Sequence, residues 1–320
     1  MQRRTFNIFG LAAASAPVLA FGKQDFPNRP IRMVLPYAPG GPTDAIARAA
    51  AQKMAEVLGV PVIVENRPGG QGIIAAQAVL LSKPDGYTVG WTPSPVLTTN
   101  RLTIKDLPYK VDDFKLVTTL YRGGMVFAVA KSSTAKSLSE YLAQVKASGK
   151  PMIYGTAGPG GNSHLTVELL AQMAGLKTQM VAYKGDAPMT LDILGGTLPA
   201  MIASLGVTGE HYRKGALKIL AFTGGERIKD YPQIPTFKES GFAIESYFWA
   251  GATVPANTPE SAVAALRNAF DVAMHGSGVR AVMTSDLVPY TRGEKEFRQM
   301  VEDEFQRWDE LVRTRGIQLQ

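Results

Sequence analysis

Apolar residues along this chain fall into short runs typical of buried strands and longer runs with helical spacing. From residue 31 onward the two patterns alternate, which indicates βαβ units and a parallel sheet. The first series ends near the glycine pair at 123–124. Its expected strands are 31–37, 60–65 and 87–92, and its expected helices are 44–58 and 73–81.

The same alternation restarts at residue 126. Its expected strands are 126–130, 152–156, 178–183, 200–203 and 217–222, and its expected helices are 138–147, 163–173 and 187–194. Beyond 249–251 the pattern gives one strand and three helices, at 259–274, 278–284 and 294–314. This tail has too few strands for a third sheet, so we expect it to pack back on the first domain.

The sequence therefore predicts an α/β protein of two domains, each a sheet flanked by helices. Domain 1 should comprise residues 24–125 plus 250–320, and domain 2 residues 126–249. The chain would cross between them twice, near 123–126 and near 247–251, and these crossings would form a hinge. A length of 320 residues suits two domains of ordinary size.

The first 22 residues have the features of an export signal. Arg3 and Arg4 provide the charged start, and an uncharged stretch at 7–22 follows that is too short to span a bilayer. The arginine pair followed by Thr5 and Phe6 also resembles a twin-arginine signal. We therefore expect the mature protein to lie outside the cytoplasm.

The chain lacks the residues or motifs that several kinds of functional site require. The chain has no cysteine, which excludes disulfides and thiolate catalysis, and its three histidines are far apart in sequence, so no metal site is expected. Neither a P-loop nor a Gly-x-Ser-x-Gly elbow occurs. The net charge of +7 comes from scattered lysines and arginines, and we expect no nucleic-acid partner and no cofactor.

Two glycine-rich turns, at 35–44 and 154–164, each follow an expected strand and open an expected helix. The first N–H groups of a helix lack intrahelical partners and carry partial positive charge, so each turn predicts a cradle for a carboxylate or phosphate. In the first turn Gly41 suits the N-cap, and Asp44 either caps the helix or contacts the ligand. In the second turn Ser163 suits the N-cap, and His164 is either structural or a general base.

The chain resembles the Bug-type (TctC-type) extracytoplasmic receptors of tripartite tricarboxylate transporters. The resemblance lies in these two turns and in the strings Val64-Glu65-Asn66-Arg67-Pro68-Gly69-Gly70-Gln71-Gly72, Tyr183-Lys184-Gly185-Asp186-Ala187-Pro188 and Ile234-Pro235-Thr236-Phe237. The resemblance covers nearly the whole mature chain. It implies a two-domain, type II-like periplasmic-binding-protein fold that closes on a small organic anion, and a periplasmic location.

The resemblance also implies a ligand in a cleft between the domains, held by Tyr37, Pro39, Gly40, Gly41 and Asp44 of the first turn and by Thr156, Gly158, Gly161, Ser163 and His164 of the second. It further implies that Thr92 and Ser94, at the end of the third expected strand, and Ala203 and Ser204 line the pocket and help to select the rest of the ligand. Lys184 ends a strand of domain 2 and is either a wall of the cleft or a solvated loop residue.

The sequence thus predicts a monomeric receptor, not an enzyme, which binds a carboxylate and delivers it to the large and small membrane subunits of a transporter. Two alternatives remain at this point: an enzyme that acts on a small anion on the same scaffold, and a sensor that presents its closed form to a membrane signalling protein. Turnover of the ligand would favour the first. Co-purification with a histidine-kinase ectodomain would favour the second.

Overall fold

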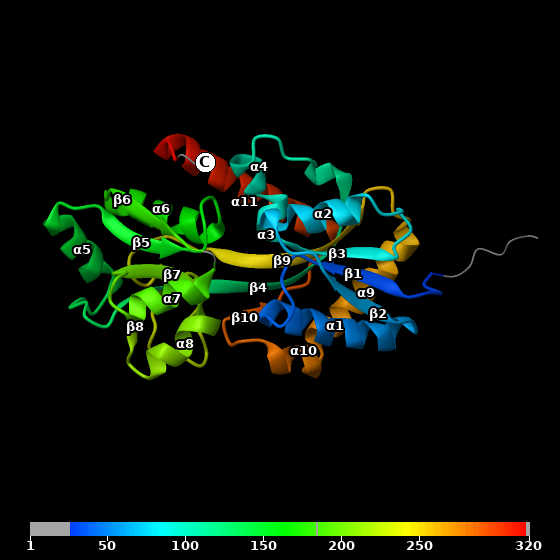
Figure 1. Cartoon of the computed structure of the whole chain (residues 1–320), viewed down its shortest axis with the longest axis horizontal. Coiled ribbons are helices and arrows are strands. Elements are labelled where there is room, and N and C mark those ends of the chain that lie inside the picture. The colour runs from blue at the N-terminus through cyan, green and yellow to red at the C-terminus, as the bar shows by residue number, and fades with distance from the viewer. Residues whose placement is uncertain (1–25, 184, 318–320) are drawn as a thin grey trace, which may run out of the picture.

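The fold is built around one long strand, β4 (Phe114–Ala130), which runs through both parts of a ten-stranded sheet in the computed structural model (Figure 1). The structure describes residues 26–183 and 185–317. The export signal expected at 1–22 lies outside the described residues, as does Lys184. Within the described part, no helix is both long enough and apolar enough to cross a bilayer.

The first part of the sheet contains residues 114–124 of β4. Its other strands are β1 (Ile31–Leu35), β2 (Val62–Asn66), β3 (Thr88–Pro93), β9 (Tyr247–Pro255) and β10 (Leu287–Pro289). β1 pairs in parallel with β2 and β3, whereas β9 is antiparallel to both β3 and β4. This arrangement confirms the parallel sheet expected from the first series.

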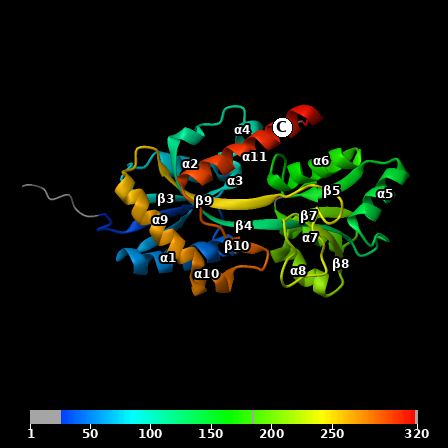
Figure 2. The same ribbon diagram turned by 180° about the vertical axis from the view of Figure 1, so that it is seen from behind.

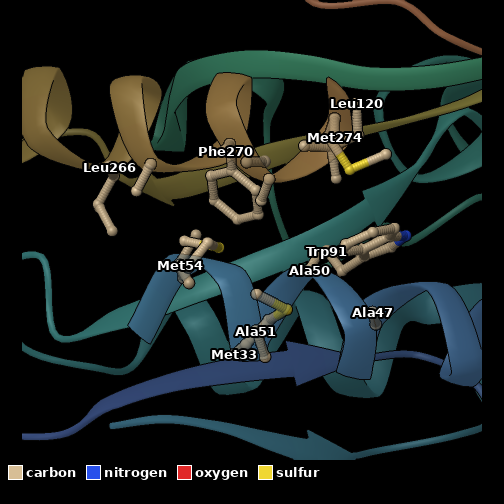
Figure 3. Close-up of a cluster of buried hydrophobic side chains, with 14 of the residues drawn as sticks. Met33, Ala47, Ala50, Ala51, Met54, Trp91, Leu120, Leu266, Phe270 and Met274 are labelled. Atoms are coloured by element: carbon tan, nitrogen blue, oxygen red, sulfur yellow. The ribbon is translucent and has the colours of Figure 1, made fainter. Parts of the chain in front are cut away.

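Helices cover both faces of this part (Figures 1 and 2). On one face lie α1 (Pro42–Leu58), α9 (Glu260–His275) and α10 (Ser277–Val282), and on the other α2 (Ile73–Leu80), α3 (Ser94–Leu97), α4 (Asn100–Thr103) and α11 (Glu294–Arg315). Ala47, Ala50 and Ala51 give α1 a small-residue face that packs with Trp91 and Phe270 in one buried cluster (Figure 3). Small side chains let the helix approach its neighbours closely, which closes the core of this part.

The second part of the sheet contains residues 125–130 of β4 with β5 (Met152–Thr156), β6 (Thr178–Ala182), β7 (Ala200–Ser204) and β8 (Leu217–Phe222). Side chains of β4 alternate between two cores, as strand geometry requires. Phe127 packs toward α5 (Leu138–Ser148) and α6 (Asn162–Ala174), and Val126 packs toward α7 (Asp186–Leu194) and α8 (Leu205–Arg213). Each part therefore has its own hydrophobic cores.

Strand directions fix where the strand ends meet. β3 and β4 are both antiparallel to β9, so both run from the first part toward the second, whereas β7 is antiparallel to β4 and runs back. The carboxyl ends of β1 and β3 consequently face those of β5, β6 and β7. In open α/β sheets ligands bind outside the carboxyl ends of the strands, so this central region is where a site should lie.

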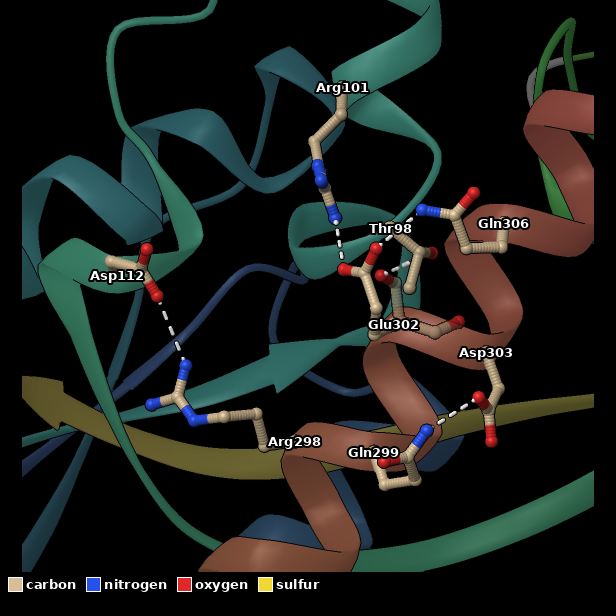
Figure 4. A network of polar contacts seen from close by, with 9 residues as sticks. Thr98, Arg101, Asp112, Arg298, Gln299, Glu302, Asp303 and Gln306 are labelled. Carbon is tan, nitrogen blue, oxygen red and sulfur yellow. Dashed lines mark hydrogen bonds and ion pairs between the residues drawn. The ribbon is translucent and has the colours of Figure 1, made fainter.

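The C-terminal helix α11 contacts both parts of the molecule (Figure 2). Near its start, Phe297 and Val301 are buried against the first part. Arg298 pairs with Asp112 at 3.1 Å, and Glu302 accepts from Arg101 at 3.3 Å (Figure 4). These contacts agree with the expected packing of the tail on the first domain.

The last turns of α11 lie against α6 of the second part. Trp308 and Leu311 pack on Leu165, and Arg315 Nη2 lies 3.1 Å from Glu168 Oε2. The sequence pattern did not indicate this second attachment. The tail therefore joins the two parts of the molecule in addition to the two strands that cross between them.

Five elements differ from the sequence prediction. The strand expected at 126–130 is only the end of β4, which begins at Phe114. The helices α3, α4 and α8 and the short strand β10 were not expected at all. Most other expected elements occur with boundaries within about two residues, a shift that is usual at element ends.

Candidate functional site

The two glycine-rich turns have the same backbone construction. We call residues 36–44 turn 1 and residues 156–164 turn 2. Gly40 and Gly160 adopt positive φ angles of 86° and 72°, and the residues that follow, Gly41 and Gly161, are helix N-caps with φ, ψ of −79°, 169° and −74°, 166°. A left-handed residue before the N-cap favours glycine because it has no Cβ. The turns therefore open α1 and α6 in the same way.

Each turn is closed by the side chain three residues after its N-cap. In turn 1 the Gly40 N–H donates to Asp44 Oδ2 at 3.0 Å, and in turn 2 the Gly160 N–H donates to His164 Nδ1 at 2.9 Å. Ser163, expected as the N-cap of the second helix, is instead the second residue of α6, because Asn162 already has helical conformation and Gly161 takes the N-cap. The expected N-cap at Gly41 is confirmed.

Asp44 is buried, with 3% of its surface exposed, and its carboxylate is fully engaged. Besides the Gly40 N–H it accepts hydrogen bonds from Arg48 Nε at 2.8 Å and Asn66 Nδ2 at 2.9 Å. The Arg48 guanidinium, with these donors, holds the pKa of Asp44 well below its usual range. These contacts support the capping interpretation, and the ion pair leaves turn 1 without a net repulsion toward an anion.

His164 is the neutral counterpart of Asp44. Burial lowers the pKa of His164 despite Glu168, whose Oε1 lies 4.0 Å from its Nε2. Its Nδ1 is occupied by the Gly160 N–H, which fixes the tautomer with the proton on Nε2. A neutral imidazole that already accepts a hydrogen bond is suited to shaping the turn.

Turn 2 also makes the contact that joins it to the first part of the molecule. A Cβ placed on Gly160 would lie 2.1 Å from Thr103 Cγ2 at the end of α4, so the Gly160 backbone lies directly against this side chain. Within the turn, the hydroxyls of Thr156 and Ser163 are 2.5 Å apart. The second turn is thus held against α4 through a glycine.

The remaining residues expected in the site lie at the facing strand ends. In the first part, Thr92 at the end of β3 is hydrogen-bonded to Thr253 Oγ1 at 2.7 Å, Ser94 is buried as the first residue of α3, and Tyr37 is 38% exposed beside turn 1. Ala203 is buried near the end of β7, and Ser204 is the N-cap of α8. Pro39 and Gly40 are exposed, while Gly41, Gly158 and Gly161 are half-buried. Their contact with a ligand remains a prediction.

Asp186 was not singled out as a site residue. Its Oδ2 accepts both the N–H and the hydroxyl of Ser204, at 2.9 and 2.8 Å. Burial raises the pKa of Asp186 even though these hydrogen bonds oppose the effect. Its place in the sequence, a few residues after the end of β6 at Ala182, is the signal that could have identified it.

A separate pocket of about 770 Å³ is lined by residues of α11 on one side and by Arg122 and Trp249 on the other. The Arg122 guanidinium lies between the rings of Tyr247 and Tyr290, 4.3 and 4.5 Å from their centroids. Arg122 lies on β4 directly opposite Trp249 of β9, so the pocket borders the two crossing strands. No sequence pattern indicated this pocket, because Arg122 precedes the glycine pair at 123–124, a pattern typical of a turn.

Glu304 of α11 also lines this pocket. Its carboxylate accepts from Trp249 Nε1 at 2.5 Å and from Thr98 Oγ1 at 3.2 Å. Burial raises the pKa of Glu304 to about 7. Glu304 therefore links the C-terminal helix to a crossing strand through a carboxyl group that changes charge near neutral pH.

The described residues contain no group of three or more His, Asp and Glu side chains arranged to hold a metal ion. The two turns instead bring the helix starts of α1 and α6 and the hydroxyls of Thr156 and Ser163 to the strand ends. Such donors bind carboxylates through hydrogen bonds without further chemistry.

Comparison with known proteins points in the same direction. A family model described as "Tripartite tricarboxylate transporter family receptor" matches residues 46–317. The chain is 31% identical to protein BugT of Bordetella pertussis (strain Tohama I) over 321 residues, which cover 99% of this chain and 98% of that protein.

Two solved structures with bound ligands are similar to this one. The structure of R. palustris Rpa4515 with adipate has a TM-score of 0.80 and 28% identity, and covers 92% of this chain and 99% of its own. MatC from Rhodopseudomonas palustris with bound malate has a TM-score of 0.76 and 29% identity, and covers 90% of this chain and 100% of its own.

Proposed function

Because the chain belongs to the family of tripartite tricarboxylate transporter receptors, whose members are periplasmic solute-binding proteins, we propose that it binds a small carboxylate between turn 1 and turn 2. The observation that carries this proposal is the repeated construction of the two turns, each with a glycine N-cap and a third-position side chain that closes it. Each turn directs a helix N-terminus toward the facing strand ends. Two such termini hold an anion from opposite sides.

The energetics of such a site are sufficient without covalent chemistry. Charge-assisted hydrogen bonds contribute about 1.5–3 kcal/mol each, and a favourable helix terminus up to about 2 kcal/mol. Several of them, less the cost of ordering and closure, reach the roughly −8 kcal/mol of micromolar binding. The proposal includes the division into residues 24–125 plus 250–320 and residues 126–249, with closure about β4 and β9.

We propose further that the protein is exported by its first 22 residues, acts as a monomer, catalyses no reaction, and passes its ligand to the large and small membrane subunits of a transporter. The occupied Nδ1 of His164 supports the absence of a general base at turn 2. Incubation of the protein with a bound carboxylate should return the compound unchanged in mass. Turnover would instead favour an enzyme on this scaffold.

Thermal unfolding of the purified mature protein with mono-, di- and tricarboxylates tests the binding proposal. A ligand at a hundred times its Kd should stabilise the protein by about 2.7 kcal/mol. Ser163→Phe should abolish this gain because Ser163 lies in the first turn of α6, next to Thr156. The control is Ser148→Phe at the exposed end of α5.

The ligand-free Ser163→Phe protein should still unfold cooperatively. Unchanged ligand affinity in this variant would remove turn 2 from the site. If no carboxylate stabilises the unmodified protein, and native mass spectrometry of the protein as purified finds no bound anion, the proposed function is wrong.

A further inference from the structure

A third helix N-terminus lies at the facing strand ends. Strand β7 leads directly into α8, with Ser204 as the N-cap and Leu205 as the first helical residue. An unoccupied helix start at this place would attract an anionic group of the ligand. In this molecule it is already occupied by protein carboxylates.

The first of these carboxylates is Asp186, which comes from the start of α7. Both hydrogen bonds from Ser204, the N–H and the hydroxyl, end on its Oδ2. Its other oxygen has no ion-pair partner among the residues that the structure describes. Asp186 thus caps α8 through one carboxylate oxygen.

The second is Asp286, which comes from the loop between α10 and β10 in the first part of the molecule. Asp286 is only 6% exposed, and neither of its oxygens accepts a well-formed hydrogen bond from any described residue. The Thr284 hydroxyl and the N–H groups of Asp286 itself and of Leu205 face its carboxylate, and Asp186 acts on it across the same helix start. Thr284 also lies beside Gly206 of α8, since its Cγ2 would be 3.5 Å from a Cβ on that glycine.

Two carboxylates therefore meet at one helix start, one from each part of the chain. The partial charge of a helix N-terminus is about half a unit, which cannot balance two full negative charges. Burial raises the pKa of both groups, as expected for acids that have no cationic partner among the described residues. A buried carboxylate without a cation beside it is costly, so a cation that entered here would be bound strongly.

We infer that the ligand is a zwitterion whose carboxylate lies at turns 1 and 2 and whose ammonium group lies between Asp186 and Asp286. This inference rests on the proposed function and narrows it to one class of substrate. A distal carboxylate of the kind found in adipate or malate would be repelled at this end. Since the two acids come from different parts of the chain, the ammonium would also bridge them when the cleft closes.

Matched pairs of compounds test the inference, because each pair shares a carboxylate and a carbon chain length. Titration calorimetry with 6-aminohexanoate against adipate, and with 4-aminobutanoate against succinate, covers two lengths. In at least one pair the amino compound should bind at least ten times more tightly than the dicarboxylate. In the double variant Asp186→Asn/Asp286→Asn this preference should disappear or reverse.

The control variant is Asp192→Asn, on the same helix α7, where the exposed carboxylate accepts a hydrogen bond from the Tyr183 hydroxyl. It should keep the preference of the unmodified protein. Equal or tighter binding of both dicarboxylates overturns the inference, as does the absence of binding by both amino compounds. Either result leaves the proposed function intact if another carboxylate binds, whereas the failure of every carboxylate contradicts both.

Discussion

Substitution of Gly160 by alanine should separate the two parts of the molecule without unfolding either one. The residue has a φ of 72°, so an alanine there costs about 1–2 kcal/mol of backbone strain. The new methyl would also lie 2.1 Å from Thr103 Cγ2, and such overpacking typically costs a further 1–3 kcal/mol. Because Thr103 belongs to the other part of the molecule, movement of turn 2 away from α4 relieves the second cost.

The equivalent substitution in turn 1 provides the control. Gly40 has a φ of 86°, but a Cβ there would meet nothing within 4 Å. Gly40→Ala should therefore show only the backbone cost. The expected difference between the two variants is about 1–3 kcal/mol in the free energy of ligand binding, which is a Kd roughly 5 to 150 times higher for Gly160→Ala.

Calorimetric titration with a bound carboxylate and small-angle scattering of the ligand-free protein measure the effect. Gly160→Ala should bind more weakly and show a larger radius of gyration, and adding Thr103→Ser, which removes Cγ2, should restore both. Equal affinities for the Gly40 and Gly160 variants would refute the reasoning, as would a failure of Thr103→Ser to rescue.

Three further predictions concern buried charges. The free energy of unfolding of the unmodified protein, measured by denaturant titration, should fall as the pH rises from about 5 to about 7. The raised pKa of Glu304 lets the folded state hold a proton that the unfolded state has already released in this range, and Glu304→Gln should make the free energy of unfolding depend less on pH. Asp44→Asn should lower the free energy of unfolding by about 1.5–3 kcal/mol at pH 7. The loss should be smaller below the usual pKa of aspartate, because the stabilisation from the Asp44 carboxylate also fades in the unmodified protein as the pH falls there. Equal losses at pH 7 and pH 3 would contradict this prediction. Arg315→Met should lower the free energy of unfolding by about 3 kcal/mol because it leaves the buried Glu168 without its cation, whereas Arg313→Met, which removes an exposed pair, should change it by less than about 1 kcal/mol.

The sequence was sufficient to predict most of the fold, because buried strands and amphipathic helices leave strong periodic signals. It failed where polar residues occur inside a strand. Residues 114–125 contain Thr118, Thr119 and Arg122 before a glycine pair, so they looked like a connection, yet they form the long strand β4 because β9 and β10 supply their hydrogen bonds. Such pairing partners come from distant sequence and cannot be read from a local pattern.

The same distinction applies to the site. The two turns were predictable because glycine, proline and a third-position acceptor follow local capping rules. Ser163 was misplaced because a glycine N-cap, Gly161, precedes it, and a serine two residues later looked like the better cap. Asp286 left no signal, since its importance arises only when a loop of the first part reaches the start of a helix in the second.

The attachment of α11 to α6 has a consequence for how the protein can be observed. Arg315 lies in the last turn of α11, and its partner Glu168 belongs to the helix that begins at turn 2. If the two parts rotate about β4 and β9, this last turn cannot move with the first part alone. A fluorophore attached to an exposed residue of the turn should report opening and closing directly, and a bulky label there should alter the equilibrium that it is used to study.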